Sequence, residues 1–261
     1  RLGLMSYLVQ GKNINLDISR VVSYRFFGNK LWNAVKFLLI YTSKDFTYAP
    51  IDRTKLTFID KWILNKLSRT IQSFEKNFDE YNFGEATNKI YSFWYYNICD
   101  VYIEALKFLL SDACELSADI KNNTKNVFLY CIEQALILLH PLTPFITEEL
   151  FQRLPHRNST AESICVASFP TDVSYIDDKV ETLGDLVLDI THGGLSVLSQ
   201  FKIQNSKPKM CIYSTDKEVV ELVSKECGVI AALARCCSVS AIDNKEDDTV
   251  KGWLSNVINS T

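Results

Sequence analysis

Apolar residues recur every three to four positions through the first 155 residues, which is the spacing of amphipathic helices. Between residues 57 and 79, for example, Trp62, Leu67, Ile71 and Phe74 fall on one side of a helix. The pattern predicts helices over residues 2–10, 17–42, 57–79, 83–112, 118–139 and 144–154. Long helices joined by short loops favour an antiparallel bundle.

Several predicted helices begin at residues that can cap them. Asp17 is a suitable N-cap for the second helix. Asn82, followed by Glu85 three residues later, predicts a capping box at the start of the fourth. Thr143 is predicted to cap the sixth, with Pro144 at its first helical position, where the missing N–H costs nothing.

The pattern changes after Phe169-Pro170. Helical segments are predicted near residues 175–201, 216–226 and after Gly228, and strands at residues 210–213, 238–242 and 253–258. Strands alternating with helices indicate a small α/β unit. The fold class is therefore mainly α, with a helix bundle over residues 1–172 and an α/β unit over residues 173–261.

Aromatic residues concentrate in the fourth predicted helix, at Phe93, Trp94, Tyr95, Tyr96 and Tyr102. A bundle interior is the usual place for such a cluster. The alternative is a platform on which unpaired bases stack.

Composition indicates a globular, cytoplasmic protein: 47% of the 261 residues are hydrophobic, and no signal peptide or transmembrane run is visible. The eight cysteines include no CxxC pair and are expected to be reduced, with a metal or redox site at Cys236-Cys237 as the alternative. The net charge of −3 excludes a strongly basic nucleic-acid binder, but it is unevenly spread. Residues 1–155 carry 18 basic and 16 acidic residues, and residues 156–261 carry 10 and 15.

Motifs of the common catalytic sites are absent from the sequence. It contains no P-loop, GxGxxG, HExxH or GxSxG pattern. His140 stands at a helix end before Pro141 and is interpreted as a C-terminal capping group rather than a base. We therefore expect no catalytic residue and no metal site in this chain.

The segment "NKLWNAVKF", residues 29–37, has an unusual polar side. At about 100° per residue, one arc of this helix carries Tyr24, Phe27, Leu31, Ala34, Val35 and Leu38, and the opposite arc carries Arg25, Asn29, Trp32, Asn33 and Lys36. Amides and arginine read base edges, lysine neutralises phosphate, and aromatic rings stack on unpaired bases. The alternative is that the two asparagines tie the helix to neighbouring backbone.

The same region resembles a known family. "YRFFGNKLWNAVKF" is similar to the signature of the anticodon-binding bundle of class I valyl-tRNA synthetases, and "QGKNINLD" resembles the segment before it. Further similar segments follow in family order: "DKWILNKL", "YSFWYYNICDVYIEALK", "LHPLTPFITEELFQRLP" and "SICVASFP". The resemblance covers residues 1–170. "PFITEEL" is shared with isoleucyl and leucyl relatives, whereas "NKLWNA", "GKNINLD" and "FQRLP" resemble the eukaryotic cytosolic valine enzyme.

The resemblance implies that the bundle binds the anticodon arm of valine tRNA. The whole enzyme would couple valine to that tRNA using ATP and Mg, and would edit misacylated threonine in an inserted domain. Neither the HIGH nor the KMSKS motif occurs here. The catalytic and editing domains are therefore expected upstream of Arg1, and this chain is expected to be a monomer that is inactive alone and needs no cofactor.

Carried over to this sequence, the resemblance implies an RNA-facing group, with Trp32 as a stacking partner and Phe26 and Phe37 flanking it or in the core. Asn82 and Phe83 lie where the loop into the fourth helix is expected to approach the anticodon. The predicted RNA-binding residues are Arg25, Asn29, Lys30, Trp32, Asn33, Lys36, Asn82 and Phe83.

One segment departs from the family pattern. Where the family carries "RxLRxxYN", this chain has "LSVLSQFK", with Leu195 and Leu198 at the arginine positions. The departure, with the acidic balance of residues 156–261, favours a packing role for the α/β unit, although Lys202, Lys207 and Lys209 offer partial compensation. Two alternative functions stay open: a protein-interaction scaffold in a synthetase complex, and the equivalent module of an isoleucyl enzyme.

Overall fold

The computed structural model describes residues 1–8, 17–42, 46, 48–155, 160–203, 207–242 and 254. They form two compact units. Unit 1 comprises residues 1–103 and 117–177, and unit 2 comprises residues 104–116 and 178–261. The sequence places a boundary at residue 172, whereas the units divide after residue 177, and unit 2 also takes in residues 104–116.

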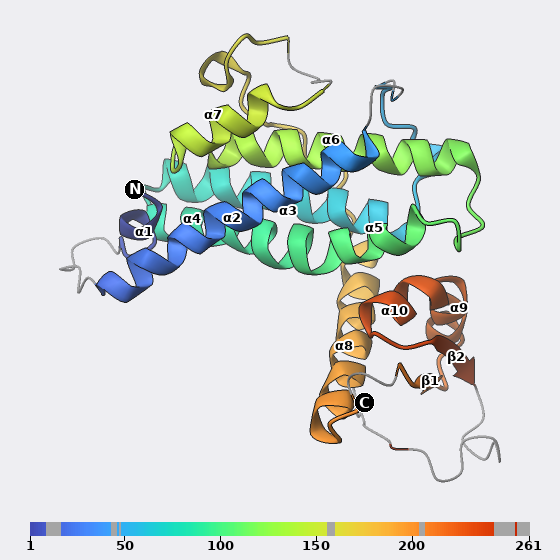
Figure 1. Cartoon of the computed structure of the whole chain (residues 1–261). Coiled ribbons are helices and arrows are strands. Elements are labelled where there is room, and N and C mark those ends of the chain that lie inside the picture. Colours follow the sequence, from blue (N-terminus) through green and yellow to red (C-terminus); the bar gives the residue numbers. More distant parts are fainter. Residues whose placement is uncertain are drawn as a thin grey trace. The chain divides into compact units, whose positions relative to one another are not determined.

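Unit 1 is the helix bundle that the sequence predicts. Its elements are α1 (Leu2–Met5), α2 (Ile18–Tyr41), α3 (Phe58–Asp79), α4 (Phe83–Ser92), the π-helical η2 (Phe93–Tyr102), α6 (Ala118–Leu139) and α7 (Pro144–Gln152), with short turns η1 (Arg53–Lys55) and η3 (Ile164–Val166). Figure 1 shows α3 beside α4 and α6, while α2 packs against η2, α6 and α7. The mainly α fold class is confirmed.

The helix starts match the predicted caps only in part. Asp17 caps α2, because its carboxylate accepts a 2.8 Å hydrogen bond from the Ser19 N–H. A capping box that the sequence analysis missed joins Thr57 and Asp60 at the start of α3. The predicted capping box at Asn82 and the predicted cap at Thr143 were wrong, because neither side chain makes a capping bond. The Asn82 amide instead donates to Asn77 Oδ1 at 3.1 Å.

Two predicted helices have different extents. The first is shorter than predicted, since α1 ends at Met5, and residues 9–16 lie outside the described residues. The fourth was predicted as one α-helix over residues 83–112, but ten of its residues form the π-helix η2 before α5 (Ile103–Leu109) resumes. A π-helix widens each turn to i→i+5 bonding, a choice that side-chain periodicity does not reveal.

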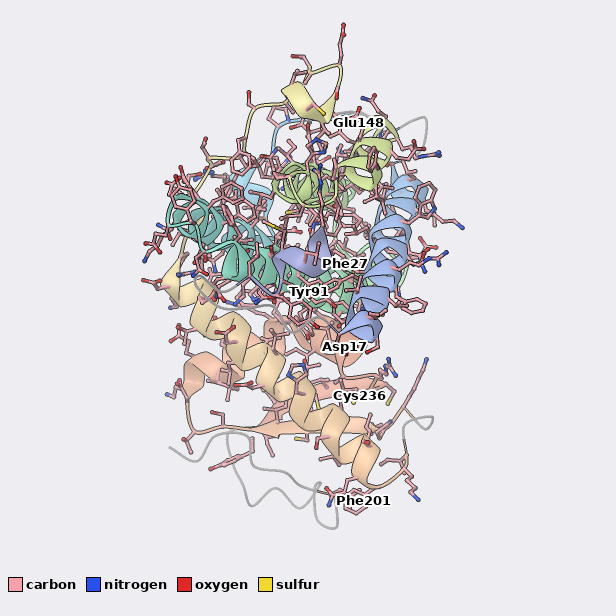
Figure 2. The ribbon with its side chains drawn as sticks, turned by 90° about the vertical axis from the view of Figure 1, so that its left-hand side faces the viewer. Asp17, Phe27, Tyr91, Glu148, Phe201 and Cys236 are labelled. Carbon is pink, nitrogen blue, oxygen red and sulfur yellow. The ribbon has the colours of Figure 1, made fainter. Side chains whose placement is uncertain are left out.

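Most of the aromatic cluster lies in the core, as predicted. Phe93, Trp94 and Tyr102 are buried, and Trp94 Nε1 donates to the carbonyl of Ala135 at 3.2 Å. The prediction was wrong for Tyr96, whose side chain is 55% exposed. Tyr91 contacts Phe27 of α2, with ring centroids 4.7 Å apart (Figure 2). These contacts fix which face of α2 turns inward.

A buried carboxyl group joins three helices of unit 1. Asp60 of α3 accepts hydrogen bonds from the hydroxyls of Tyr102 (2.6 Å) and Thr124 (2.7 Å), which belong to η2 and α6. Burial raises the pKa of Asp60 by more than these bonds lower it. The group is thus a polar link whose ionisation is costly.

Unit 2 contains the predicted α/β arrangement. Its strands β1 (Lys209–Tyr213) and β2 (Ser238–Ile242) pair in parallel, with Lys209 opposite Ser238. The helices are α8 (Asp178–Gln200), α9 (Lys217–Lys225) and α10 (Cys227–Leu233), and α5 contributes from Glu104 onward. Residues 243–253 and 255–261, which include all of the third predicted strand except Leu254, lie outside the described residues.

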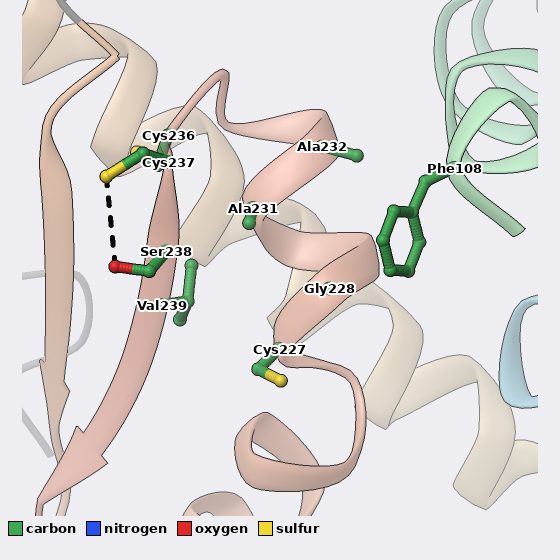
Figure 3. A pocket seen from close by; sticks show the side chains of 9 residues that line it. All are labelled: Phe108, Cys227, Gly228, Ala231, Ala232, Cys236, Cys237, Ser238 and Val239. Carbon is green, nitrogen blue, oxygen red and sulfur yellow. Dashed lines mark hydrogen bonds between the residues drawn. The ribbon is translucent and has the colours of Figure 1, made fainter. Parts of the chain in front are cut away.

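Close packing inside unit 2 depends on a glycine. Phe108 faces α10 at Gly228, and a Cβ there would overlap its ring (Figure 3). A small hollow beside this contact is lined by Phe108, Cys227, Gly228, Ala231, Ala232, Cys236, Cys237, Ser238 and Val239. On α8, Leu198 is buried and Leu195 half-buried, so the residues at the family's arginine positions pack instead of facing solvent.

Candidate nucleic-acid interface

The structure separates the two faces of α2 as the sequence pattern predicts. The inner face carries Phe27, Leu31, Ala34, Val35 and Leu38, all at most 3% exposed, with Tyr24 half-buried at its edge. The side chains of Arg25, Asn29, Trp32, Asn33 and Lys36 are all exposed on the opposite side, which we call the outer face of α2. Helical periodicity and burial of one arc are sufficient to produce this division.

The polar side chains of the outer face are not used to hold the fold together. Within the described part of the chain, Arg25, Asn29, Asn33 and Lys36 have no side-chain hydrogen-bond or ion-pair partner. The described residues therefore contain no tether from Asn29 or Asn33 to neighbouring backbone. Two amides and two cations are therefore exposed to solvent.

Apolar groups accompany these polar ones on the surface of α2. Trp32 is 40% exposed, Phe26 is 65% exposed, and Val22 and Ile40 are also solvent-exposed. Phe37, in contrast, is half-buried against Phe128, with ring centroids 6.1 Å apart. Of the two flanking aromatics, Phe26 belongs to the surface and Phe37 to the core. An exposed mixture of aromatic, amide and cationic groups suits unpaired bases better than a purely charged surface does.

The sequence analysis missed one cation beside this face. The Arg153 guanidinium carbon lies 4.9 Å from the centre of the Trp32 ring, a cation–π contact. Arg153 follows the last residue of α7, and its Nε also donates to Glu149 at 2.8 Å. Ile146 of α7 packs near Gly28 of α2, where a Cβ would lie 3.4 Å from the Ile146 Cδ1, an ordinary van der Waals distance. The one sequence signal for Arg153 was its place in "FQRLP".

Lys30 is positioned differently from the other predicted residues. Its Nζ lies 3.0 Å from Asp100 and 3.2 Å from the centre of the Tyr95 ring. Burial acts to lower the pKa of Lys30, but the hydrogen bonds with Asp100 and Tyr95 outweigh it, so the pKa is raised. Its charge is thus directed toward η2, at the border between the two faces.

Asn82 and Phe83 lie at the start of α4, not on α2. Asn82 is exposed, and Phe83 packs against Phe78 and Tyr81, with ring centroids 5.0 and 6.0 Å away. This end of α4 contacts α1, which also contacts α2 near its start, so all three meet at one end of the bundle (Figure 1). Among the described residues, no hydrogen bond, ion pair or ring contact joins Asn82 or Phe83 to the outer face of α2.

The described residues contain no group of three or more His, Cys, Asp or Glu side chains placed to hold a metal ion. No described helix is both long and apolar enough to cross a membrane.

The sequence matches the model of a known protein family. The model for the anticodon-binding domain of tRNA ligases matches residues 60–213, more than half of the chain. The chain belongs to this family. The matched residues include η2, α6 and α7, which pack against α2.

Individual relatives in the family are valine–tRNA ligases. That of Homo sapiens is 36% identical over 248 residues, which are 93% of this chain and 19% of the human protein. The mitochondrial enzyme of Saccharomyces cerevisiae is 36% identical, covering 99% and 23%, and that of Fervidobacterium nodosum is 32% identical, covering 98% and 28%. The resemblance to the valine enzymes is confirmed. The chain spans about a fifth to a quarter of the length of these relatives.

Proposed function

We propose that unit 1 is the anticodon-arm recognition module of a valine–tRNA ligase and that the outer face of α2 binds the RNA. The observation that carries the proposal is that Arg25, Asn29, Asn33 and Lys36 are exposed together with no side-chain partner in the described residues. Membership in the anticodon-binding family and similarity to valine–tRNA ligases support it.

Each residue type suggests a role. Asn29, Asn33 and Arg25 can pair with base edges, and Trp32, with Arg153 beside it, offers a surface for a stacked base. Lys36 neutralises phosphate. Asn82 and Phe83 approach the same RNA from the end of the bundle. Lys30 acts mainly by holding α2 to η2, through Asp100 and Tyr95.

The whole protein, in this proposal, couples valine to its tRNA using ATP and Mg, with a catalytic domain upstream in the same chain. The support is the similarity to valine–tRNA ligases over almost all of this chain. We further propose that the protein is cytoplasmic and monomeric. This chain contributes the tRNA contact and no catalytic group.

The test is binding of the 261-residue chain to valine tRNA and to isoleucine tRNA at low and moderate salt. We expect a preference for valine tRNA that is lost in the double variant Asn29→Ala/Asn33→Ala. Asn122→Ala, an exposed asparagine on α6, is the matched control and should bind as the unaltered chain does. Equal binding of both tRNAs, unaffected by the double variant, would remove the outer face of α2 from anticodon recognition.

Arg25 has its own expected effect. If its guanidinium pairs with a base edge, Arg25→Ala weakens binding to valine tRNA by about 1–3 kcal/mol. Lys61→Ala, which removes an exposed cation from α3, is the control for the loss of charge. The same loss in both variants would mean that Arg25 acts only through its charge.

A further inference from the structure

A thiol and an imidazole lie in contact at the edge of α7, outside the RNA-binding surface. The Cys165 Sγ is 3.3 Å from the His140 Nε2. Cys165 is exposed and belongs to the turn η3, and His140 follows the end of α6. The sequence analysis interpreted His140 as a helix-capping group, but its ring is directed to other partners.

The other ring nitrogen of His140 has a partner that selects the tautomer. Nδ1 lies 2.8 Å from the hydroxyl of Thr147, which is buried. The Thr147 hydroxyl donates its single proton to a main-chain carbonyl, that of Thr143 (2.9 Å) or Pro144 (3.2 Å). It therefore accepts from Nδ1–H of His140, which leaves the Nε2 lone pair of a neutral ring facing the Cys165 thiol.

The electrostatic surroundings leave His140 unprotonated and place a carboxylate near its ring. Burial lowers the pKa of His140 more than the nearby Glu148 raises it, so the ring is neutral and ready to accept a proton at neutral pH. Glu148 is ionised, because hydrogen bonds from Gln152, Ser163 and Ile164 outweigh burial and lower its pKa. Its carboxylate lies on α7 (Figure 2) and favours the imidazolium once it forms.

We propose that Cys165 is a modification site: a histidine-activated thiol that forms a mixed disulfide with small-molecule disulfides. His140 Nε2 takes the thiol proton, and the thiolate attacks one sulfur of the small disulfide. That S–S bond breaks as the new one forms, and the departing thiolate takes the proton from the imidazolium. Cys165 is oxidised and half of the small disulfide is reduced, so no further reagent is needed.

The other cysteines provide internal references. Cys237 is also exposed, but its Sγ contacts a hydroxyl, that of Ser238 at 3.8 Å. Cys131 is buried, and burial raises its thiol pKa well above the usual value.

An ordinary thiol with a pKa near 8.5 is about 3% ionised at pH 7, so complete activation raises its rate by at most ~30-fold. Lower nucleophilicity of an activated thiolate offsets part of that gain.

The experiment treats the reduced 261-residue chain with bis(2-hydroxyethyl) disulfide at pH 7 and follows each cysteine by peptide mass spectrometry. This probe is neutral, so local charge does not bias its approach. We expect Cys165 to react about tenfold faster than Cys237. His140→Gln should bring the two rates together without changing that of Cys237. Equal rates in the unaltered chain, or an unchanged Cys165 rate in His140→Gln, would overturn the proposal.

Labelling of Cys131 reports whether a variant is still folded. If His140→Gln exposes Cys131, the Thr147→Val variant tests the proposal instead. It keeps the shape of the side chain and removes the hydroxyl that sets the tautomer of His140. A slower Cys165 reaction in a Thr147→Val chain with Cys131 still protected supports the proposal. An unchanged rate there means that the sulfur–imidazole contact is only structural.

Discussion

At the scale of single residues, two lysines on the same helix illustrate how position changes function. Lys30 is held by Asp100 and covers the Tyr95 ring, whereas Lys36 is exposed on the outer face of α2 with no side-chain partner among the described residues. Releasing counterions from RNA requires a cation that is free to approach phosphate. Replacing Lys36 should therefore mainly weaken tRNA binding, whereas replacing Lys30 should mainly lower the stability of the fold.

We expect Lys36→Ala to weaken tRNA binding and to lower the slope of log affinity against log salt by about one. Lys30→Ala should leave that slope nearly unchanged and lower the free energy of unfolding by about 0.5–1 kcal/mol, the size of an exposed ion pair with a cation–π contact. Titration at several salt concentrations and urea unfolding measure the two effects. A salt slope changed equally by both variants would contradict the distinction.

At the scale of elements, unit 1 is joined by a carboxyl group that is costly to ionise. Asp60 links α3 to η2 and α6, and burial raises its pKa in the folded chain. In the unfolded chain its pKa is about 3.9. As pH rises above that value, the unfolded carboxyl loses its proton first, so stability is lost until the pH passes the raised folded pKa.

Asp60→Asn cannot ionise, so it should remove this pH-dependent loss. Asparagine also changes the hydrogen bonds with Tyr102 and Thr124, which shifts the free energy of unfolding by the same amount at each pH. We expect the variant to gain stability relative to the unaltered chain as pH rises from about 4 to 7. Urea unfolding followed by tryptophan fluorescence reports mainly unit 1, which holds Trp32, Trp62 and Trp94. If the variant and the unaltered chain differ in free energy of unfolding by the same amount across this pH range, the pKa of Asp60 is not raised.

In unit 2, the packing of α10 depends on the absence of a side chain at Gly228. A Cβ there overlaps the Phe108 ring, so Gly228→Ala should destabilise unit 2 by about 1–3 kcal/mol. Phe108→Leu in the same chain makes room and should recover part of the loss. Protection of Cys236 and Cys227 from alkylation measures the effect. Full stability of Gly228→Ala alone would mean that the ring moves aside freely.

At the scale of the whole molecule, the proposed function separates tRNA binding from catalysis. The family match supports tRNA binding, and the outer face of α2 is the surface proposed for it, while the sequence contains neither the HIGH nor the KMSKS motif. We expect the 261-residue chain, given valine, ATP, Mg and tRNA, to form no detectable valyl-tRNA while still binding the tRNA. Acid-stable radiolabelled valine on tRNA is the measure. Formation of valyl-tRNA above the protein-free background would overturn this division of roles.

The sequence alone determined the properties that depend on local periodicity. The inner and outer faces of α2, the bounds of α6 and the strand at residues 238–242 follow from which positions are apolar, because a regular helix or strand repeats its faces at a fixed spacing. Asp17 was identified for the same reason, since a cap acts within one turn of its own helix.

Only the tertiary structure decided which distant residues meet. Arg153 lies over Trp32, Asp100 takes the charge of Lys30, and Cys165 reaches His140. The π-helix between Phe93 and Tyr102 and the Asn82–Asn77 bond in place of a cap were likewise not evident from periodicity. Each of these depends on packing between segments far apart in sequence or on a choice among backbone hydrogen bonds, and neither leaves a repeating pattern in the chain.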